Sequence, residues 1–325
     1  MWITVDRPAS CMKNVVTIGG GTGTYAVLTA LKSFDFNLSA IVSMCDDGGS
    51  TGQLRDDYGV LPPGDIRRSL IALSPTSQSL RRLFDYRFQG GSLDGHNFGN
   101  LFLTALEKTE GGFRQAVLAV SHLLNVKGRV IPVTLSGVRL HTELENGKII
   151  TGETNIDIPK HNSRVKIKKV FIKPLAHPNQ QALEAIKEAN LIIIGPGDLY
   201  TSVIPNFLVR GIAKAVRSSR ARKILICNLM TKNGETNGYS AVDFLEVVEN
   251  YLGKNTVDYV LINSKKPGKV RLKRYSEENC QPVILPKDFK EKPDKAVILK
   301  ADVLTKRGLI RHDPKKLGRQ ILNLV

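Results

Sequence analysis

Three glycine-rich segments at 19–24, 46–52 and 195–202 each follow a short apolar run, and their residues suit the binding of phosphate. Glycine lets a backbone approach a ligand closely, and free N–H groups at the start of a helix carry partial positive charge. The first segment stands between the apolar run 15–18 and a helical pattern at 25–31. Its candidate ligand-binding residues are Gly20, Gly21, Thr22, Gly23 and Thr24.

The first segment is compatible with more than one kind of turn. It is not a Walker A loop, because no Gly-Lys-Ser/Thr follows, but Gly21-x-Gly23-x-x-Ala26 fits a dinucleotide fingerprint. A tight strand-to-helix turn without a ligand is the structural alternative. An NAD-dependent dehydrogenase is the least favoured reading, because the second strand ends in a glycine loop where that fold usually enters a helix.

The second segment begins with two acidic residues, Asp46 and Asp47, and continues with Gly48, Gly49 and Ser50. Two carboxylates beside such a loop suit a divalent ion, ligand hydroxyls or a general base. An Asx turn is an equally good reading for Asp47. We therefore expect all five residues to bind ligand. Asp46 and Asp47 are also the candidate Mg²⁺ ligands and, in an enzyme, the catalytic groups; no other cofactor is predicted.

Further polar residues stand at predicted helix starts. Asp65 is expected to be the N-cap of a helix that runs to residue 73, and Arg67 lies in its first turn. A cation there opposes the helix dipole, which favours anion binding, although solvated arginines are the common explanation of such residues. His96, Asn97 and Asn100 open another helix and are expected to contact a base, a sugar or an oxyanion.

The third segment repeats the first pattern of buried strand, glycine turn and helix. Its candidate ligand-binding residues are Gly195, Pro196, Gly197, Asp198, Tyr200, Thr201 and Ser202, and Asn228 follows the next strand. Open α/β sheets place their sites at the carboxyl ends of strands. These segments therefore predict one ligand site at one edge of a sheet.

The pattern of elements predicts an α/β fold with a Rossmann-like, mainly parallel sheet and flanking helices. The expected parts are an N-terminal extension at 1–12, the first half of the core at 13–127, a β-rich insertion at 128–178, and the second half with a C-terminal α/β segment at 179–325. Strands of the insertion are expected at 130–135, 138–142, 149–152 and 165–172. Strands of the core are expected at 38–44, 191–194, 224–227 and 257–263, and strands of the tail at 283–285 and 297–299. Helices are expected at 79–88, 113–124, 180–189, 205–216, 241–252 and from 314.

Composition narrows the function classes. The net charge is +17 and the hydrophobic content 42%, but the basic residues are dispersed and no nucleic-acid-binding motif occurs, so we expect no nucleic-acid partner. The four cysteines, Cys11, Cys45, Cys227 and Cys280, form no Cys-x-x-Cys pair, which argues against a zinc site or disulfide framework and favours the cytoplasm. No apolar run reaches the ~18 residues of a membrane span.

The order of the motifs resembles a known family. The segments 19–24, 46–52, 63–67, 96–100, 195–202, 237–240 and 311–313 occur in the order found in the bacterial gluconeogenesis factor family, the YvcK-like branch of the CofD-like superfamily. The resemblance covers nearly the whole chain from about residue 13. It implies a Rossmann-like core, frequent homodimers, and binding of UDP-sugars such as UDP-N-acetylglucosamine. It also implies links to cell shape, cell-wall enzymes and carbon metabolism.

The resemblance also suggests residue roles. In the gluconeogenesis branch a Tyr of an Arg-Tyr segment and the Arg of Arg-His-Asp help hold the UDP-sugar, and these match Tyr275 and Arg311. Relatives carry a phosphorylatable Thr after Arg-His-Asp, whereas this chain has Pro314. A related archaeal branch transfers 2-phospho-L-lactate from a guanylylated donor to a deazaflavin alcohol, and there the acidic pair that matches Asp46 and Asp47 supports metal and substrate binding.

Two function hypotheses therefore stand. The first is a UDP-sugar-binding regulator of envelope and carbon metabolism. The alternative is a phosphotransferase like the deazaflavin branch, with Mg²⁺ held by the acidic pair. The same residues serve both readings, so the sequence leaves open whether the protein is an enzyme.

Overall fold

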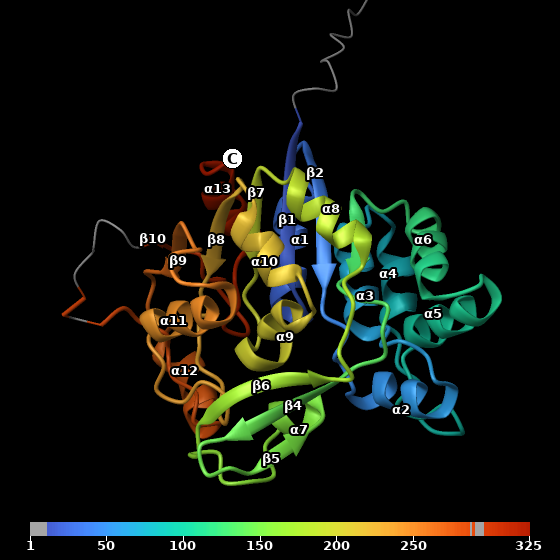
Figure 1. The fold of residues 1–325 in the computed structure, drawn as a ribbon, viewed down its shortest axis with the longest axis horizontal. Coiled ribbons are helices and arrows are strands. Elements are labelled where there is room, and N and C mark those ends of the chain that lie inside the picture. The colour runs from blue at the N-terminus through green and yellow to red at the C-terminus, as the bar shows by residue number, and fades with distance from the viewer. Residues whose placement is uncertain (1–11, 287, 290–295) are drawn as a thin grey trace, which may run out of the picture.

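A computed structural model describes residues 12–286, 288–289 and 296–325, and a seven-stranded parallel sheet forms its centre (Figure 1). The strands of this sheet are β1 (Lys13–Gly19), β2 (Phe36–Val42), β3 (Arg129–Pro132), β7 (Leu191–Ile194), β8 (Arg222–Ile226), β9 (Tyr259–Asn263) and β10 (Val297–Ala301). The predicted α/β, mainly parallel fold is confirmed. Cys11 and all of the expected N-terminal extension except Met12 lie outside the described residues.

The sheet reverses its direction of growth at β1. The strand order is β10-β9-β8-β7-β1-β2-β3, so the chain builds outward from β1 to one side and later from β7 to the other. The neighbours β1 and β7 pair in parallel, with Val15 beside Leu191 and Ile18 beside Ile194. In open α/β sheets, ligands bind outside the carboxyl ends of the two strands at such a switch point.

Helices cover both faces of the large sheet. The helices before the small sheet are α1 (Gly21–Leu31), α2 (Gly49–Tyr58), α3 (Gly64–Leu73), α4 (Gln78–Asp85), α5 (Phe98–Thr109) and α6 (Phe113–Leu123). Those after it are α8 (Gln180–Glu188), the π-helix η2 (Leu199–Val203), α9 (Ile204–Leu208), α10 (Ile212–Ser218), α11 (Ala241–Leu252), α12 (Lys269–Glu277) and α13 (Pro314–Leu322). In Figure 1, α8, α9 and α10 lie in front of β1, and α1 lies behind it.

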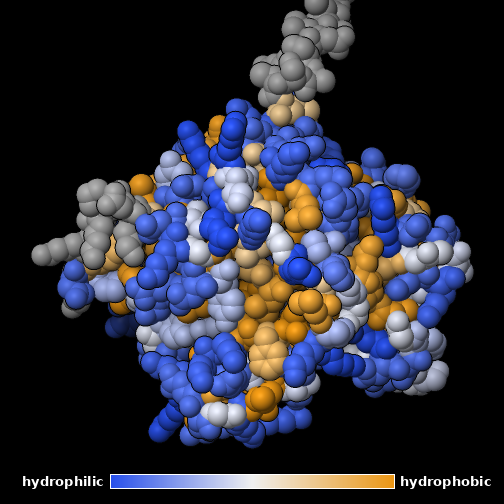
Figure 2. All heavy atoms as spheres, viewed as in Figure 1, coloured by the Kyte–Doolittle hydropathy of each residue, from blue (hydrophilic) through white to orange (hydrophobic). Residues whose placement is uncertain are grey.

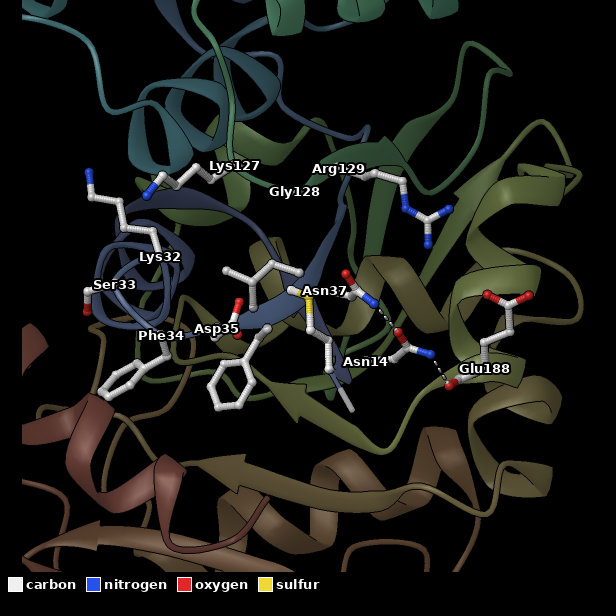
Figure 3. Close-up of a pocket in the computed structure, with 13 residues that line it drawn as sticks. Asn14, Lys32, Ser33, Phe34, Asp35, Asn37, Lys127, Gly128, Arg129 and Glu188 are labelled. Atoms are coloured by element: carbon white, nitrogen blue, oxygen red, sulfur yellow. Dashed lines mark hydrogen bonds between the residues drawn. The ribbon is translucent and has the colours of Figure 1, made fainter. Parts of the chain in front are cut away.

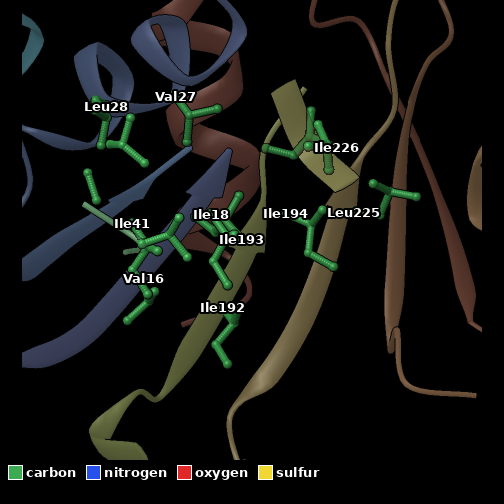
Figure 4. Close-up of a cluster of buried hydrophobic side chains, with 14 of the residues drawn as sticks. Val16, Ile18, Val27, Leu28, Ile41, Ile192, Ile193, Ile194, Leu225 and Ile226 are labelled. Carbon is green, nitrogen blue, oxygen red and sulfur yellow. The ribbon is translucent and has the colours of Figure 1, made fainter. Parts of the chain in front are cut away.

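The central strands are apolar because both of their faces are covered. Ile192, Ile193 and Ile194 are successive residues of β7, and each is fully buried. Figure 4 shows them with Ile18, Ile41 and other aliphatic side chains from neighbouring strands and from α1. This core fixes the ends of β1 and β7, from which the glycine-rich turns leave.

A second, antiparallel sheet contains β4 (Arg139–Leu144), β5 (Ile149–Thr151) and β6 (Ile167–Lys173), with the short helix α7 (Glu153–Asp157) after β5. The predicted turn at Asn146-Gly147 connects β4 and β5. The strand expected at 130–135 is shorter and lies in the large sheet as β3, where it pairs with β2. In Figure 1 the arrowhead of β2 points toward α2, and the small sheet lies on the same side.

Several other predicted elements are corrected. No strand forms at 283–285; the preceding residue, Pro282, forms an isolated bridge with Met230. The helix expected at 205–216 is interrupted before Gly211, whose φ of +88° is left-handed. A glycine-rich loop is expected after Asp47, but helix α2 already begins at Gly49. Helix α12 is absent from the predicted elements.

One face of the molecule is mainly polar (Figure 2), and the described cysteines are buried. The face in Figure 2 is mainly hydrophilic, with an apolar area over α9 and β6. Within the described part of the chain, Cys45, Cys227 and Cys280 are buried and free of disulfides. Among the helices in this part, none has the length and apolar character needed to cross a membrane.

Candidate functional site

Two adjoining cavities lie at the carboxyl ends of β1 and β7. One, the polar chamber, has a volume of about 330 Å³ and is lined by carboxylates, arginines and hydroxyls. The other, the tyrosine chamber, has a volume of about 440 Å³ and is lined by Tyr25, Tyr275 and apolar side chains. Both chambers are lined by Gly21, Thr22, Asp198 and Ser202. They therefore meet at the N-terminus of α1, where the switch-point rule places a ligand.

Most of the predicted residues are brought together here. The polar chamber is lined by Asp46, Gly48, Gly49, Ser50, Asp65, Arg67, Asn100 and Thr201, and the tyrosine chamber by Gly23, Pro196, Gly197, Asn228, Tyr275 and Arg311, in addition to the four shared residues. Seven predicted residues do not line either cavity, namely Gly20, Thr24, Asp47, His96, Asn97, Gly195 and Tyr200.

The glycines of the first loop allow two backbone segments to touch. A Cβ on Gly23 would lie 1.9 Å from the carbonyl oxygen of Pro196, so a side chain there would collide with backbone. A Cβ on Gly20 would lie 2.5 Å from a carboxylate oxygen of Asp65. Gly20 is the N-cap of α1, and the first turn holds no acidic side chain. The N-terminus of α1 thus presents backbone amides at the junction of the chambers, where an anion is favoured, and the carboxyl group of Asp65 already lies beside the amide of Gly21.

The loop after β7 is held by a residue that the sequence reasoning missed. Glu235 is only 3% exposed, and its carboxylate accepts hydrogen bonds from the backbone N–H of Tyr200 (2.9 Å) and the hydroxyl of Thr201 (3.2 Å). Burial raises the pKa of Glu235 well above its ordinary value, with a smaller contribution from Asp198. Tyr200 itself is buried, and its hydroxyl bonds that of Tyr239 at 2.9 Å. Glu235 and Tyr200 therefore support the π-helix η2.

Asp46 and Asp47 have different surroundings. Asp46 lines the polar chamber, and one of its oxygens accepts a hydrogen bond from the N–H of Gly48 at 3.0 Å. The two oxygens of Asp47 accept hydrogen bonds from the backbone N–H groups of Glu153 (3.1 Å) and Thr154 (2.9 Å). Asp47 therefore caps the N-terminus of α7, which explains why it does not line the chamber. Burial raises the pKa of Asp46.

The prediction that Asp65 is the N-cap of α3 is wrong. Pro63 occupies that position, and Asp65 lies in the first helical turn, where a carboxylate favours the helix dipole. One oxygen of Asp65 lies 3.5 Å from the guanidinium of Arg68. Burial, followed by repulsion from Asp46, raises the pKa of Asp65 to about 6. Asp46 and Asp65 thus place two carboxyl groups in one chamber.

Arg67 and Asn100 form a buried polar wall. The Arg67 guanidinium donates to the Asn100 side chain (3.0 Å), to the carbonyl of Phe84 (3.0 Å) and to Asp85 (2.6 Å). These contacts make Arg67 partly structural, although it lines the polar chamber. Its position is compatible with a negatively charged ligand group.

Asn97 and His96 support this wall from outside the chamber. Asn97 is the N-cap of α5, and its side chain accepts a hydrogen bond from the N–H of Asn100 at 3.1 Å. The Ser50 hydroxyl accepts from the N–H of Asn97 at 3.1 Å and lies 3.4 Å from His96 Nδ1. The motif at 96–100 therefore fastens α5 to α2, and of its polar side chains only Asn100 reaches the cavity.

The small sheet contributes a wall that the sequence reasoning did not foresee. Glu153, Thr154, Asp157 and Ile158, from α7 and the residue after it, line the polar chamber. Burial, followed by repulsion from Asp46 and Asp157, raises the pKa of Glu153 to about 9. Only the placement of α7 by Asp47 reveals these residues, because five residues carry too little periodicity to predict a helix.

Tyr275 and Arg311 reach the tyrosine chamber from two segments that are fastened together. The Tyr275 hydroxyl accepts a hydrogen bond from the N–H of Ile310 at 3.1 Å. Arg271 donates to the carbonyl (2.8 Å) and hydroxyl (2.9 Å) of Thr305 and to the carbonyl of Leu309 (2.6 Å). Both residues of the predicted pair therefore face one cavity.

A third part of this chamber is the loop after β8. The Asn228 side chain donates to the carbonyl of Gly197 at 2.8 Å and accepts from its N–H at 3.2 Å. His312, which also lines the chamber, is buried, and its burial lowers its pKa to about 4. The imidazole is therefore neutral at physiological pH.

A larger cavity of about 720 Å³ lies at the opposite edge of the sheet, beside the start of β1 and β2 (Figure 3). One of its lining cations, Lys32, has a structural role. Lys32 donates to the carbonyl of Ser74 at 3.3 Å, and Arg81 donates to the same carbonyl, at the carboxyl end of α3. Cations are favourable at that end of a helix. None of the three glycine-rich segments at 19–24, 46–52 and 195–202 lines this cavity, so we do not assign it to the site.

Comparisons with known proteins identify the family and match the fold. The family model described as 2-phospho-L-lactate transferase CofD matches residues 15–304. The gluconeogenesis factor of Halalkalibacterium halodurans is 42% identical over 312 residues, covering 95% of this chain and 96% of its own. The gluconeogenesis factor of Bacillus subtilis is 39% identical over 318 residues, covering 96% and 98%. A crystal structure of a Bacillus halodurans protein superposes with a TM-score of 0.91 at 41% identity, covering 96% of this chain and 99% of that one.

Proposed function

Since this chain belongs to the 2-phospho-L-lactate transferase CofD family, we propose that it is a gluconeogenesis factor-like protein that binds a UDP-sugar of the UDP-N-acetylglucosamine type. One observation carries the proposal: two chambers of different chemistry meet at the N-terminus of α1. A nucleotide sugar also has two halves of different chemistry, joined by a diphosphate. The proposed ligand spans the junction.

The junction suits the diphosphate. Gly21 and Thr22 open α1, and Ser202 faces them from η2. Backbone amides and a hydroxyl at a helix start bind phosphate without a bound cation. Asp198 is the one shared residue that is unfavourable to a phosphate, and burial raises its pKa to about 6.

The tyrosine chamber suits the uridine. Its apolar side chains include Leu229, Met230 and Ile310, and the ring of Tyr275 offers a surface on which a base can stack. Arg311 lines the same chamber, where its guanidinium can pair with a phosphate oxygen. The polar chamber, with its carboxylates and Asn100, then receives the sugar hydroxyls, which donate readily to carboxylate oxygens.

The proposal extends to the cellular role that the resemblance implies. The protein would report UDP-sugar levels to cell-wall and carbon metabolism as a cytoplasmic homodimer, with cell-wall enzymes as protein partners. Size-exclusion chromatography with light scattering tests the dimer, since a homodimer has twice the 35.8 kDa mass of the chain. A monomer with and without ligand would contradict that part of the proposal.

A phosphotransferase is the second candidate, and the acidic polar chamber favours it. Asp46 and Asp65 both line this chamber and fit a hard divalent cation such as Mg²⁺, whereas both Asp47 oxygens already accept backbone N–H groups. When bound, Mg²⁺ would neutralise phosphate charge. Arg67 and Arg68 line the chamber where a transferred phosphoryl group would develop negative charge. In this reading an acceptor alcohol attacks the phospho-lactyl phosphorus, and a nucleoside monophosphate leaves.

A thermal-shift panel separates the candidates. The full chain is heated with UDP-N-acetylglucosamine, UDP-glucose, GDP or NAD, each in Mg²⁺ or in EDTA. The first proposal predicts stabilisation by UDP-sugars in both buffers, because a ligand that binds only the folded state raises its Tm. Stabilisation by GDP in Mg²⁺ alone, with no response to UDP-sugars, would contradict it and favour the transferase.

A further inference from the structure

The loop at 231–240, which follows β8, ties the small sheet to the rest of the molecule. Gly234 has a φ of +85°, and a Cβ there would lie 2.6 Å from a ring carbon of Pro159. The Asn237 side chain donates to the carbonyl of Ser163 at 2.7 Å. The segment just after α7 is therefore held against this loop at two points.

Lys232, in the same loop, stands between carboxylates from different segments. Its Nζ lies 2.8 Å from Oδ1 of Asp157, in α7, and 3.8 Å from Oδ2 of Asp198, in the loop after β7. Carboxylate oxygens of Asp157, Asp198 and Glu235 all lie within 4.8 Å of one another. Burial disfavours the charged form of Glu235, so the main repulsion at this spacing is between Asp157 and Asp198 when both are ionised, and the lysine ammonium offsets it.

We propose that Lys232 is a positioning residue: its ammonium joins Asp157 to Asp198 and so fixes the α7 wall of the polar chamber at the distance that the sugar half of the ligand requires. The inference rests on the proposed function, because the sugar is assigned to that chamber. Burial lowers the pKa of Lys232, but Asp198 and Asp157 raise it more, so the ammonium remains charged at neutral pH.

The geometry makes the effect of Lys232 stronger on one half of the ligand. Asp157 and Ile158 line the polar chamber but not the tyrosine chamber. Without the ammonium, Asp157 and Asp198 would face each other without a neighbouring cation. Asp47 still holds the start of α7, so we expect the shift to be confined to the end of α7 that carries Asp157. Tyr275 is fastened separately by its bond to Ile310. Asp198, the other partner of Lys232, lines both chambers, so loss of Lys232 also leaves a negative charge beside the diphosphate. Loss of Lys232 should therefore weaken binding of the sugar half more than binding of the UDP half.

The test compares two ligands in one variant. Lys232→Met keeps the length of the side chain and removes its charge. Calorimetric titration in EDTA is expected to show a Kd for UDP-N-acetylglucosamine raised about tenfold, and a Kd for UDP raised by no more than about threefold through the exposed charge of Asp198. Asp157→Asn removes the charge of the carboxylate that pairs with Lys232. We define the Kd ratio as the Kd for UDP-N-acetylglucosamine divided by the Kd for UDP. In the double variant Lys232→Met with Asp157→Asn, the change in the logarithm of this ratio should be smaller than the sum of the changes in the two single variants.

Lys168→Met is the matched control, because Lys168 forms an exposed ion pair with Glu143 on the small sheet and lines neither chamber. It should leave both Kd values unchanged. Equal losses for both ligands in Lys232→Met, or no loss, would overturn the inference while the proposed function stands. A wild-type chain that binds no UDP-sugar would instead overturn the proposed function. If Lys232→Met does not fold, the Kd ratio of Asp157→Asn alone decides.

Discussion

Asp46 and Asp47 are adjacent in the sequence, yet their carboxylates meet different groups. Asp46 faces the polar chamber, and Asp47 binds two backbone N–H groups of α7. A side chain of this type can serve a ligand or a helix start, and only the position of α7 decides which. At the residue scale, the motif therefore combines one ligand-facing acid with one structural acid.

Substitution of each aspartate separates these roles. Asp47→Ala should lower the free energy of unfolding by about 2–3 kcal/mol, because two N–H groups lose a charged acceptor. Asp46→Asn should change stability by less than about 1 kcal/mol, because a buried carboxylate with a raised pKa is replaced by a neutral group. Urea denaturation measures both values. Equal losses in the two variants would contradict the assignment.

The acidity of Asp65 makes stability depend on pH. Its folded pKa of about 6 lies above the ordinary value of 3.8, so the folded state binds more protons than the unfolded state between these values. Stability from this group is therefore present at low pH and is lost as the pH rises from about 4 to about 6. The stability of Asp65→Asn relative to wild type should rise over the same range, measured by urea denaturation in EDTA.

His312 has the opposite dependence, because its folded pKa of about 4 lies below 6.5 and its contribution grows as the pH rises. The contribution of His312 is the same in wild type and in Asp65→Asn, so it cancels in the difference between their free energies of unfolding. A difference that is constant from pH 4 to pH 7 would show that Asp65 titrates normally.

At the scale of elements, the site depends on the contact between the turns after β1 and β7. Gly23 and Pro196 approach so closely that a methyl group does not fit between them. The contact fixes the start of α1 relative to the loop that leads to η2. The two chambers can share one junction only while these turns touch.

Gly23→Ala should therefore abolish UDP-sugar binding and cost about 2 kcal/mol or more of stability, because the clash is with backbone that cannot rotate away. Gly137→Ala is the control, since no atom lies within 4 Å of its added Cβ. Thermal unfolding and calorimetry measure the two effects. Wild-type binding by Gly23→Ala would contradict the proposed junction.

Prediction from sequence succeeded where the signal was local. The apolar run at 191–194 and the glycines beside it predict a buried strand and a ligand loop, because burial on both faces leaves a continuous apolar stretch. It failed where the signal was absent or distant. Helix α12, Lys269–Glu277, has no buried residue and hence no clear apolar stripe. The hydrogen bond that the N–H of Tyr200 donates to Glu235 joins residues 35 positions apart in the sequence, and hydrophobic periodicity cannot predict such a contact.

Whole-molecule organisation explains why the site has two parts. The large sheet supplies the junction at its switch point, the small sheet supplies α7 for the polar chamber, and the C-terminal segments supply Tyr275 and Arg311 for the other. Family membership and the close superposition with a solved structure support this architecture. A ligand that spans both chambers would be held by all three parts.

Calorimetric titration of the full chain with UDP-N-acetylglucosamine, beside Arg311→Ala, tests the central claim most directly. The account predicts micromolar binding to one site per chain, equal in Mg²⁺ and EDTA, and at least about tenfold weaker in Arg311→Ala, because a charge-assisted bond to phosphate is lost. No heat of binding from UDP-N-acetylglucosamine, together with Mg²⁺-dependent binding of GDP, would contradict it.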